Sequence, residues 1–226
     1  MIKEVHSFKD TKTASMILLL DQVYKEIEEA EAEWQKACPV RCIDGCGMCC
    51  VHFEPEIYEV EALYLAAWLL YHQRERALQI LEGNFKENVL DKEKGCLLFD
   101  IDNPHHCTVY GGRALICRLF GYSGDRGKDF TVRWRPCKYL VSLDKEGSNL
   151  KQYSQSDLLE TFGMLPPVMS DFTSRILCFM TEGSSEARPI RDALRAAIAK
   201  ILMLERYATN SDFEPDTDPE TPPLAS

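Results

Sequence analysis

The feature that most constrains this chain is a run of four cysteines within nine positions, CIDGCGMCC at residues 42–50. The gaps of three and two residues between the first three cysteines let a short loop bring several sulfurs to one side of an ion or cluster. Gly45 and Gly47 allow the tight backbone that such a loop requires. Thiolate sulfur selects zinc, copper(I) or iron–sulfur centres over magnesium or calcium. The run therefore predicts a site for a soft metal.

Further cysteines follow in segments that we expect to be loops or the ends of elements, where ligands are easily aimed. With the run they give the candidate metal ligands Cys42, Cys46, Cys49, Cys50, Cys96, Cys107, Cys117 and Cys137. Such a set would suit two four-coordinate zinc ions, two clusters, or one centre with a redox pair. Successive side chains of an extended chain diverge, so we expect Cys49 and Cys50 not to share one tetrahedral site. This favours more than one metal or a polynuclear centre, and an iron–sulfur cluster slightly over zinc.

Two other cysteines and three histidines have weaker claims. Cys178 lies in an apolar run and is expected to be a buried packing residue. Cys38 lies at the end of the first predicted helix and could equally be a metal ligand or a residue without a role in the site. His52, His105 and His106 could each supply an imidazole in place of a thiolate, and His52 could instead pair with Cys107 or Cys117 as a nucleophile. Histidines in loops are more often simply exposed.

The first three cysteines of the run also match the spacing that holds the cluster of radical S-adenosylmethionine enzymes. That motif should follow a strand at the start of a large α/β barrel. Here a helical pattern precedes the run, βα alternation is absent, and Cys50 is left unexplained. We therefore reject this interpretation.

Hydrophobic periodicity predicts a mainly α fold, with one helical domain over residues 1–210, a minor β hairpin and a cysteine-rich metal-binding loop region. Extended pieces are expected around Asn103 and Pro104 and over 129–134. The acidic, proline-rich tail 211–226 is expected to be disordered. Helices are expected over about 13–37, 55–72, 74–90, 156–162, 167–180 and 189–207.

The N-terminus does not resemble an export signal, and no apolar stretch is long enough to span a membrane. We therefore expect a cytoplasmic protein, in which clustered cysteines act as ligands or redox groups rather than as disulfides. The formal net charge of −10 argues against nucleic acid as the main partner.

One segment, residues 113–138, is basic within this acidic chain. Its positive charges could offset the charge of metal-bound thiolates and donate hydrogen bonds to sulfur, which is the interpretation we favour. They could instead form a solvated face or dock an acidic ligand or protein partner. The basic residues are Arg113, Arg118, Arg126, Lys128, Arg133, Arg135 and Lys138.

The cysteines and their neighbours resemble a known family, the CxxCxxCC cysteine-cluster family, also called YkgJ-like. The resemblance covers about residues 40–140 and implies a zinc- or iron-chelating domain in which the eight cysteines are ligands and Arg113 and Arg118 belong to the site. The first gap is three residues rather than the family's two, and Ala114 replaces a usual proline; neither change removes a sulfur. The resemblance is carried by the run at 42–50, Cys96, CTVY at 107–110, Arg113, CRLF at 117–120 and Cys137.

Three functions remain open. The first is a metal-binding protein that holds an iron–sulfur cluster or zinc and has a redox or electron-transfer role. The second is a structural zinc-binding interaction module. The third, implied only by the resemblance because the family includes proteins similar to flagellin lysine methylases, is an S-adenosylmethionine-dependent protein lysine methylase.

Overall fold

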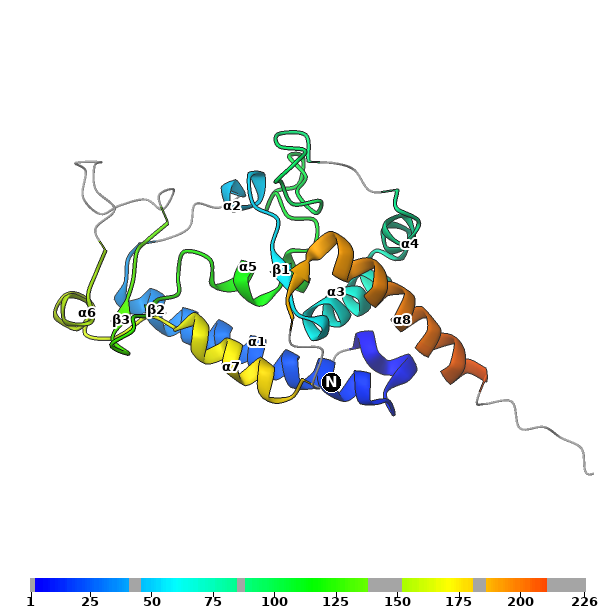
Figure 1. Cartoon of the computed structure of the whole chain (residues 1–226), viewed down its shortest axis with the longest axis horizontal. Coiled ribbons are helices and arrows are strands. Elements are labelled where there is room, and N and C mark those ends of the chain that lie inside the picture. Colours follow the sequence, from blue (N-terminus) through cyan, green and yellow to red (C-terminus); the bar gives the residue numbers. More distant parts are fainter. Residues whose placement is uncertain (1–2, 41–45, 85–87, 138–151, 181–185, 211–226) are drawn as a thin grey trace, which may run out of the picture.

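The computed structural model describes residues 3–40, 46–84, 88–137, 152–180 and 186–210, and the predicted mainly α fold is confirmed. The longest helix, α1 (Lys12–Ala37), runs along the molecule and connects its two ends (Figure 1). Its N-terminus is fixed by Thr11, whose hydroxyl oxygen accepts a hydrogen bond from the amide of Ala14 at 3.1 Å. No described helix is long and apolar enough to cross a membrane.

The main hydrophobic core is built around α3 (Glu59–His72), which is apolar on nearly all sides and is covered by α1, α4 (Arg74–Glu82) and α8 (Ile190–Asn210). A short 3-10 helix, η1 (Lys3–Phe8), closes this core with two buried apolar side chains. Because α3 is surrounded, the residues at its two ends are held rigidly.

A second, smaller core lies at the far end of α1, where Trp34 packs edge-on against Trp134 and Phe162. The described part of this end contains α6 (Gln155–Phe162), α7 (Met169–Cys178) and the antiparallel hairpin of β2 (Asp125–Arg126) and β3 (Val132–Arg133) (Figure 1). This hairpin matches the minor β structure predicted near residues 129–134.

A second strand pair, β1 (Glu56–Ile57) with β4 (Arg188–Pro189), was not predicted. It joins the start of α8 to the segment that follows the cysteine run. The amide of Ile190 donates to the carbonyl of Pro55 at 3.0 Å, and the Arg191 guanidinium pairs with the Glu54 carboxylate at 2.7 Å.

Two expectations about local structure were wrong. The helix predicted over 74–90 ends at Glu82, because Gly83 follows with a φ of 83° and caps it in the left-handed conformation. The extended pieces expected around Asn103 and Pro104 are turns, joined only by an isolated bridge between Phe99 and Cys107. The tail 211–226 lies outside the described residues.

Candidate metal centre

Six of the predicted ligands line one cavity of about 340 Å³. They come from the residues just before the short helix α2 (Met48–Val51), from α2 itself, from the two loops before α5, and from α5 (Leu115–Leu119). The cysteines on the cavity wall are Cys46, Cys49, Cys50, Cys96, Cys107 and Cys117.

The first of these segments is organised by Gly47, which precedes α2 with a φ of 56°. A side chain at this position would be strained and would also collide with His106, since a Cβ built there lies 2.3 Å from the Cβ of His106. The carbonyl of Gly47 accepts a hydrogen bond from the amide of Cys50 at 2.9 Å, which starts the helical turn.

The helical turn places Cys49 and Cys50 on the same side, with their Sγ atoms 3.8 Å apart. The expectation that these two side chains diverge was wrong, because it assumed an extended chain and the chain here is helical. In a tetrahedron with metal–sulfur bonds of 2.3 Å, neighbouring sulfurs lie about 3.8 Å apart. The pair is therefore spaced as two ligands of one tetrahedral ion.

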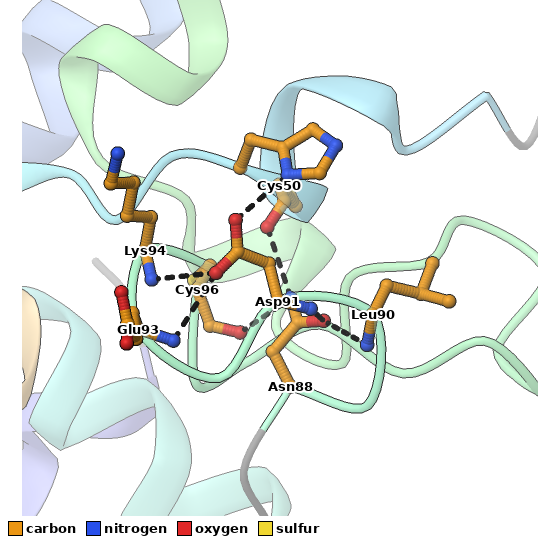
Figure 2. Close-up of polar contacts among 8 residues, drawn as sticks. Cys50, Asn88, Leu90, Asp91, Glu93, Lys94 and Cys96 are labelled. Carbon is orange, nitrogen blue, oxygen red and sulfur yellow. Dashed lines mark hydrogen bonds and ion pairs between the residues drawn. The ribbon is translucent and has the colours of Figure 1, made fainter.

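Cys96 is fixed next to Cys50 by the loop that contains Asn88 (Figure 2). The Asn88 side chain donates from Nδ2 to the carbonyls of Cys50 and Cys96, at 3.2 and 3.4 Å, and accepts at Oδ1 from the amides of Leu90 and Asp91. A Cβ at Gly95 would lie 2.4 Å from Nδ2 of Asn88, so the loop can close only over glycine. Nothing in the sequence pattern marked Asn88.

The same loop also contacts the side chain of His52, which does not line the cavity. The Asp91 carboxylate accepts hydrogen bonds from the amides of Glu93 and Lys94 through Oδ1 (Figure 2). Its Oδ2 contacts Nδ1 of His52 at 2.8 Å. The hydrogen bond from His52 lowers the pKa of Asp91. His52 thus has a carboxylate partner and is not on the cavity wall.

Cys107 is placed by pairing between its loop and the Cys96 loop. Thr108 donates to the carbonyl of Leu98 from both its amide and its hydroxyl, at 3.1 and 2.9 Å. Of the two preceding histidines, His105 lines the cavity and stacks on Tyr110, whereas His106 stacks on Phe99. Nδ1 of His106 is buried without a hydrogen-bond partner among the described residues.

Cys117 is positioned by Glu61, a carboxylate on α3 that is only 3% exposed. Oε1 of Glu61 accepts from the amide of Leu115 at 2.7 Å and from the Tyr24 hydroxyl at 3.1 Å. Burial raises the pKa of Glu61. The helix that carries Cys117 is thereby tied to the rigid core, a contact that the sequence analysis missed.

The two arginines assigned to the site differ in their surroundings. Arg118 is 6% exposed and donates to the carbonyls of Arg113 and Gly111 and to the Glu28 carboxylate, at 2.8, 2.9 and 2.8 Å. Its guanidinium also lies 4.1 Å from the centre of the Tyr24 ring. Arg113 lines the cavity; its charge adds to the lowering of the Cys49 pKa by the Cys50 hydrogen bond and partly opposes the burial that raises the pKa of Cys107.

The thiols are mostly held neutral by their surroundings. Burial raises the pKa of Cys107 and Cys117 and raises that of Cys96 to about 12. The exception is Cys49, whose pKa is lowered to about 7, first because Cys50 donates a hydrogen bond to its sulfur. The pKa of Cys50 is raised by the same hydrogen bond. A metal that binds here must therefore displace protons from buried thiols.

The remaining predicted residues lie elsewhere. Cys137 is half-buried and is not on the cavity wall, and Cys42 and Lys138 lie outside the described residues. Cys38 is buried in the smaller core, and Cys178, expected to be buried, is exposed at the end of α7. In the described ranges no three of the Cys, His, Asp or Glu side chains already stand in coordinating geometry.

Part of the basic segment is taken up by ion pairs on the hairpin. Arg126 binds both carboxylate oxygens of Asp171, at 3.0 and 2.7 Å, and Arg133 pairs with Asp129 at 3.1 Å. Only Arg113 and Arg118 of the described basic residues in this segment line the cavity. Within the described part of this segment, Arg113 and Arg118 are therefore the residues that can offset negative charge on the thiolates.

A helical scaffold that gathers cysteines from distant segments around one cavity is typical of a thiolate metal-binding domain. Residues 41–138 match the model of the CxxCxxCC family, described as a putative zinc- or iron-chelating domain. The predicted resemblance is confirmed, and this segment is assigned to zinc or iron chelation by that match. No curated protein and no solved structure matches the chain.

Proposed function

We propose that the chain binds a single zinc or iron ion through thiolates that converge on the cavity, with Cys49 and Cys50 as adjacent ligands. The observation that carries this proposal is their Sγ–Sγ distance of 3.8 Å, which equals the sulfur–sulfur edge of a tetrahedral site. The sequence pattern favoured a cluster for two reasons: the two side chains were expected to diverge, and eight candidate thiolates suit polynuclear chemistry. The first reason no longer applies, and six of the eight cysteines line the cavity, so we prefer a mononuclear centre.

The other ligands are chosen by position on the cavity wall. The amide of Cys96 is bonded to the carbonyl of Cys50, and the loop of Cys107 is paired with the loop of Cys96. Negative charge on Cys96 or Cys107 raises the pKa of Cys50. Negative charge on Cys96, Cys107 or Cys49 also raises the pKa of Cys117, which lies on α5. We propose that two of these three complete the tetrahedron with Cys49 and Cys50.

Charge and burial support a tightly bound ion. Four thiolates on a divalent ion leave a net charge of −2, and a buried anionic centre needs compensation. Arg113 supplies it, since its charge already favours the thiolates of Cys49 and Cys107. When bound, the ion would supply a fixed cross-link between α2 and two of the three segments that carry Cys96, Cys107 and Cys117, and iron would also supply a one-electron couple.

This proposal distinguishes between the functions left open by the sequence. A redox role follows if the ion is iron, and a structural or ligand-binding role follows if it is zinc. The lysine methylase alternative rests on the family resemblance alone, and no contact described above adds to it.

The experiment is metal analysis of the purified chain with its visible absorption spectrum, repeated on three variants. We expect close to one equivalent of zinc or iron in the wild type, and a loss of most of it in both Cys49→Ser and Cys50→Ser. Cys178→Ser is the matched control, because Cys178 is exposed on α7 and should keep the metal. A wild type without bound metal, or an equal loss in all three variants, contradicts the proposal.

A further inference from the structure

The cavity lined by the thiols also has an apolar wall, which would contribute no ligand to a metal ion. Beyond the sulfurs it is mainly apolar, and no Asp, Glu or Lys is among the described residues that line it. Its volume of about 340 Å³ is in the range of small-molecule sites. A tetrahedral ion lies within about 2.3 Å of its sulfurs and leaves most of such a space free. The apolar wall includes Phe53, Pro55, Leu65, Ile116, Phe120 and Ile190.

Arg113 is a preorganised cation on this wall. Its Nε donates to the carbonyl of Tyr110 at 2.9 Å, and its guanidinium lies 3.6 Å from the centre of the Tyr110 ring. His105 stacks on the same ring at 4.3 Å, so the two groups must occupy opposite faces of Tyr110. Among the described residues, the terminal nitrogens of Arg113 have no hydrogen-bond acceptor. Arg113 therefore keeps its two-pronged donor face available.

The neighbouring Arg118 cannot serve this purpose. All three nitrogens of its guanidinium donate to fixed acceptors on Arg113, Gly111 and Glu28. Within the described part of the wall, Arg113 is thus the one arginine with donors to spare.

Two aromatic side chains on the cavity wall are partly open to solvent. Phe53 and Phe120 are 38% and 41% exposed, and their ring centres lie 6.2 Å apart. They come from different segments, and together they offer an apolar contact to a molecule that enters from solvent.

We propose that the cavity binds a small organic carboxylate with an apolar body, its charged group on Arg113 and its apolar part against Phe53 and Phe120, beside the metal centre. This inference deepens the proposed function and rests on it, since the centre then has a ligand-binding space on one side. A carboxylate matches the fork of a single arginine with two parallel hydrogen bonds. A more highly charged anion would face the thiolates, and the described part of the wall offers only the Arg113 guanidinium to hold it.

The test is calorimetric titration of the metal-loaded chain with 3-phenylpropionate and with its neutral amide, 3-phenylpropionamide. We expect the acid to bind at one site and the amide to bind at least about tenfold more weakly, because the amide lacks the charge that Arg113 recognises. Arg113→Gln, loaded with metal to the same content as the wild type, should bind the acid about tenfold or more weakly. Arg126→Gln is the matched control, since Arg126 lies on the hairpin and should leave acid binding as it is.

Metal content is measured on every sample, so the two proposals fail in different ways. A wild type that carries no metal contradicts the proposed function. A metal-loaded wild type that binds acid and amide equally, or binds neither at about 10 mM, overturns the carboxylate site. A metal-loaded Arg113→Gln that binds the acid as tightly as the wild type also overturns it.

Discussion

The backbone carbonyl of Cys50 accepts a hydrogen bond from the backbone amide of Cys96 at 3.0 Å. Two thiols that are remote in the sequence are therefore fixed as neighbours by the main chain, before any metal binds. Asn88, which is 2% exposed, reinforces this arrangement by donating to the carbonyls of both residues. The geometry of the candidate centre thus depends on a buried amide that is not itself a ligand.

Asn88→Ala should lower both stability and metal affinity. The change leaves the amides of Leu90 and Asp91 without their side-chain acceptor and removes one of the two donors to each of the Cys50 and Cys96 carbonyls. We expect the free energy of unfolding to fall by about 2–3 kcal/mol and metal affinity to fall by about tenfold or more. Urea unfolding and chelator competition measure the two effects. The control is Asn84→Ala, an exposed asparagine after α4; an equal effect there would contradict the role of Asn88.

Arg118→Lys should destabilise the fold despite the retained charge. Lysine cannot reach the carbonyls of Arg113 and Gly111 and the Glu28 carboxylate together, as the guanidinium does. We expect a loss of about 2–4 kcal/mol in the free energy of unfolding by urea. Arg126→Lys, at the exposed pair with Asp171, should cost less than about 1 kcal/mol. Comparable losses in the two variants would show that Arg118 is not a structural clamp.

Glu31→Gln should change how stability depends on pH. Burial raises the pKa of Glu31 from 4.5 to about 7, and Arg113 and Arg118 only partly oppose this shift. Between these two pH values the folded state binds more protons than the unfolded state, so the wild type loses stability as pH rises. The variant lacks this loss and should gain about 2 kcal/mol relative to wild type between pH 5 and pH 8.

Urea unfolding at the two pH values measures the effect of Glu31→Gln. Glu29→Gln, an exposed carboxylate on the same helix, should keep a constant difference from wild type. A constant difference for Glu31→Gln as well would contradict the burial of a charged Glu31.

Much of the fold and part of the site followed from the sequence. The stripe of Leu20, Val23, Ile27 and Trp34 predicted α1 correctly, because long apolar periodicity reports burial directly. The cysteine spacing found six residues that line one cavity. It could not show that Cys49 and Cys50 lie on a helical turn, since a four-residue helix such as α2 has no periodicity to detect.

The supporting residues were missed for a different reason. Asn88 and Glu61 act through hydrogen bonds to residues far away in the sequence, and a lone buried amide or carboxylate leaves no local pattern. Cys178 was predicted to be buried from the apolar residues around it, but it lies on the exposed side near the end of α7. Composition alone does not give the orientation of a side chain on a short helix.

Phe130→Gly should stabilise the hairpin. Phe130 lies at the turn between β2 and β3 with a φ of 62°, and its side chain is 79% exposed. A phenylalanine in the left-handed region costs about 1–2 kcal/mol, and glycine removes this cost while losing little packing. After the entropy cost of glycine, we expect a gain of about 0.5–1 kcal/mol in thermal or urea unfolding. Phe130→Ala, which keeps the Cβ, should show almost no gain; an equal gain would attribute the effect to the ring.

The most direct test of the central claim is X-ray absorption spectroscopy at the metal edge of the loaded protein. We predict a first shell of about four sulfur atoms at about 2.3 Å, because the proposed centre takes Cys49, Cys50 and two of the three thiolates of Cys96, Cys107 and Cys117. A first shell made only of oxygen and nitrogen, or a short metal–metal distance typical of a cluster, would contradict a mononuclear thiolate centre.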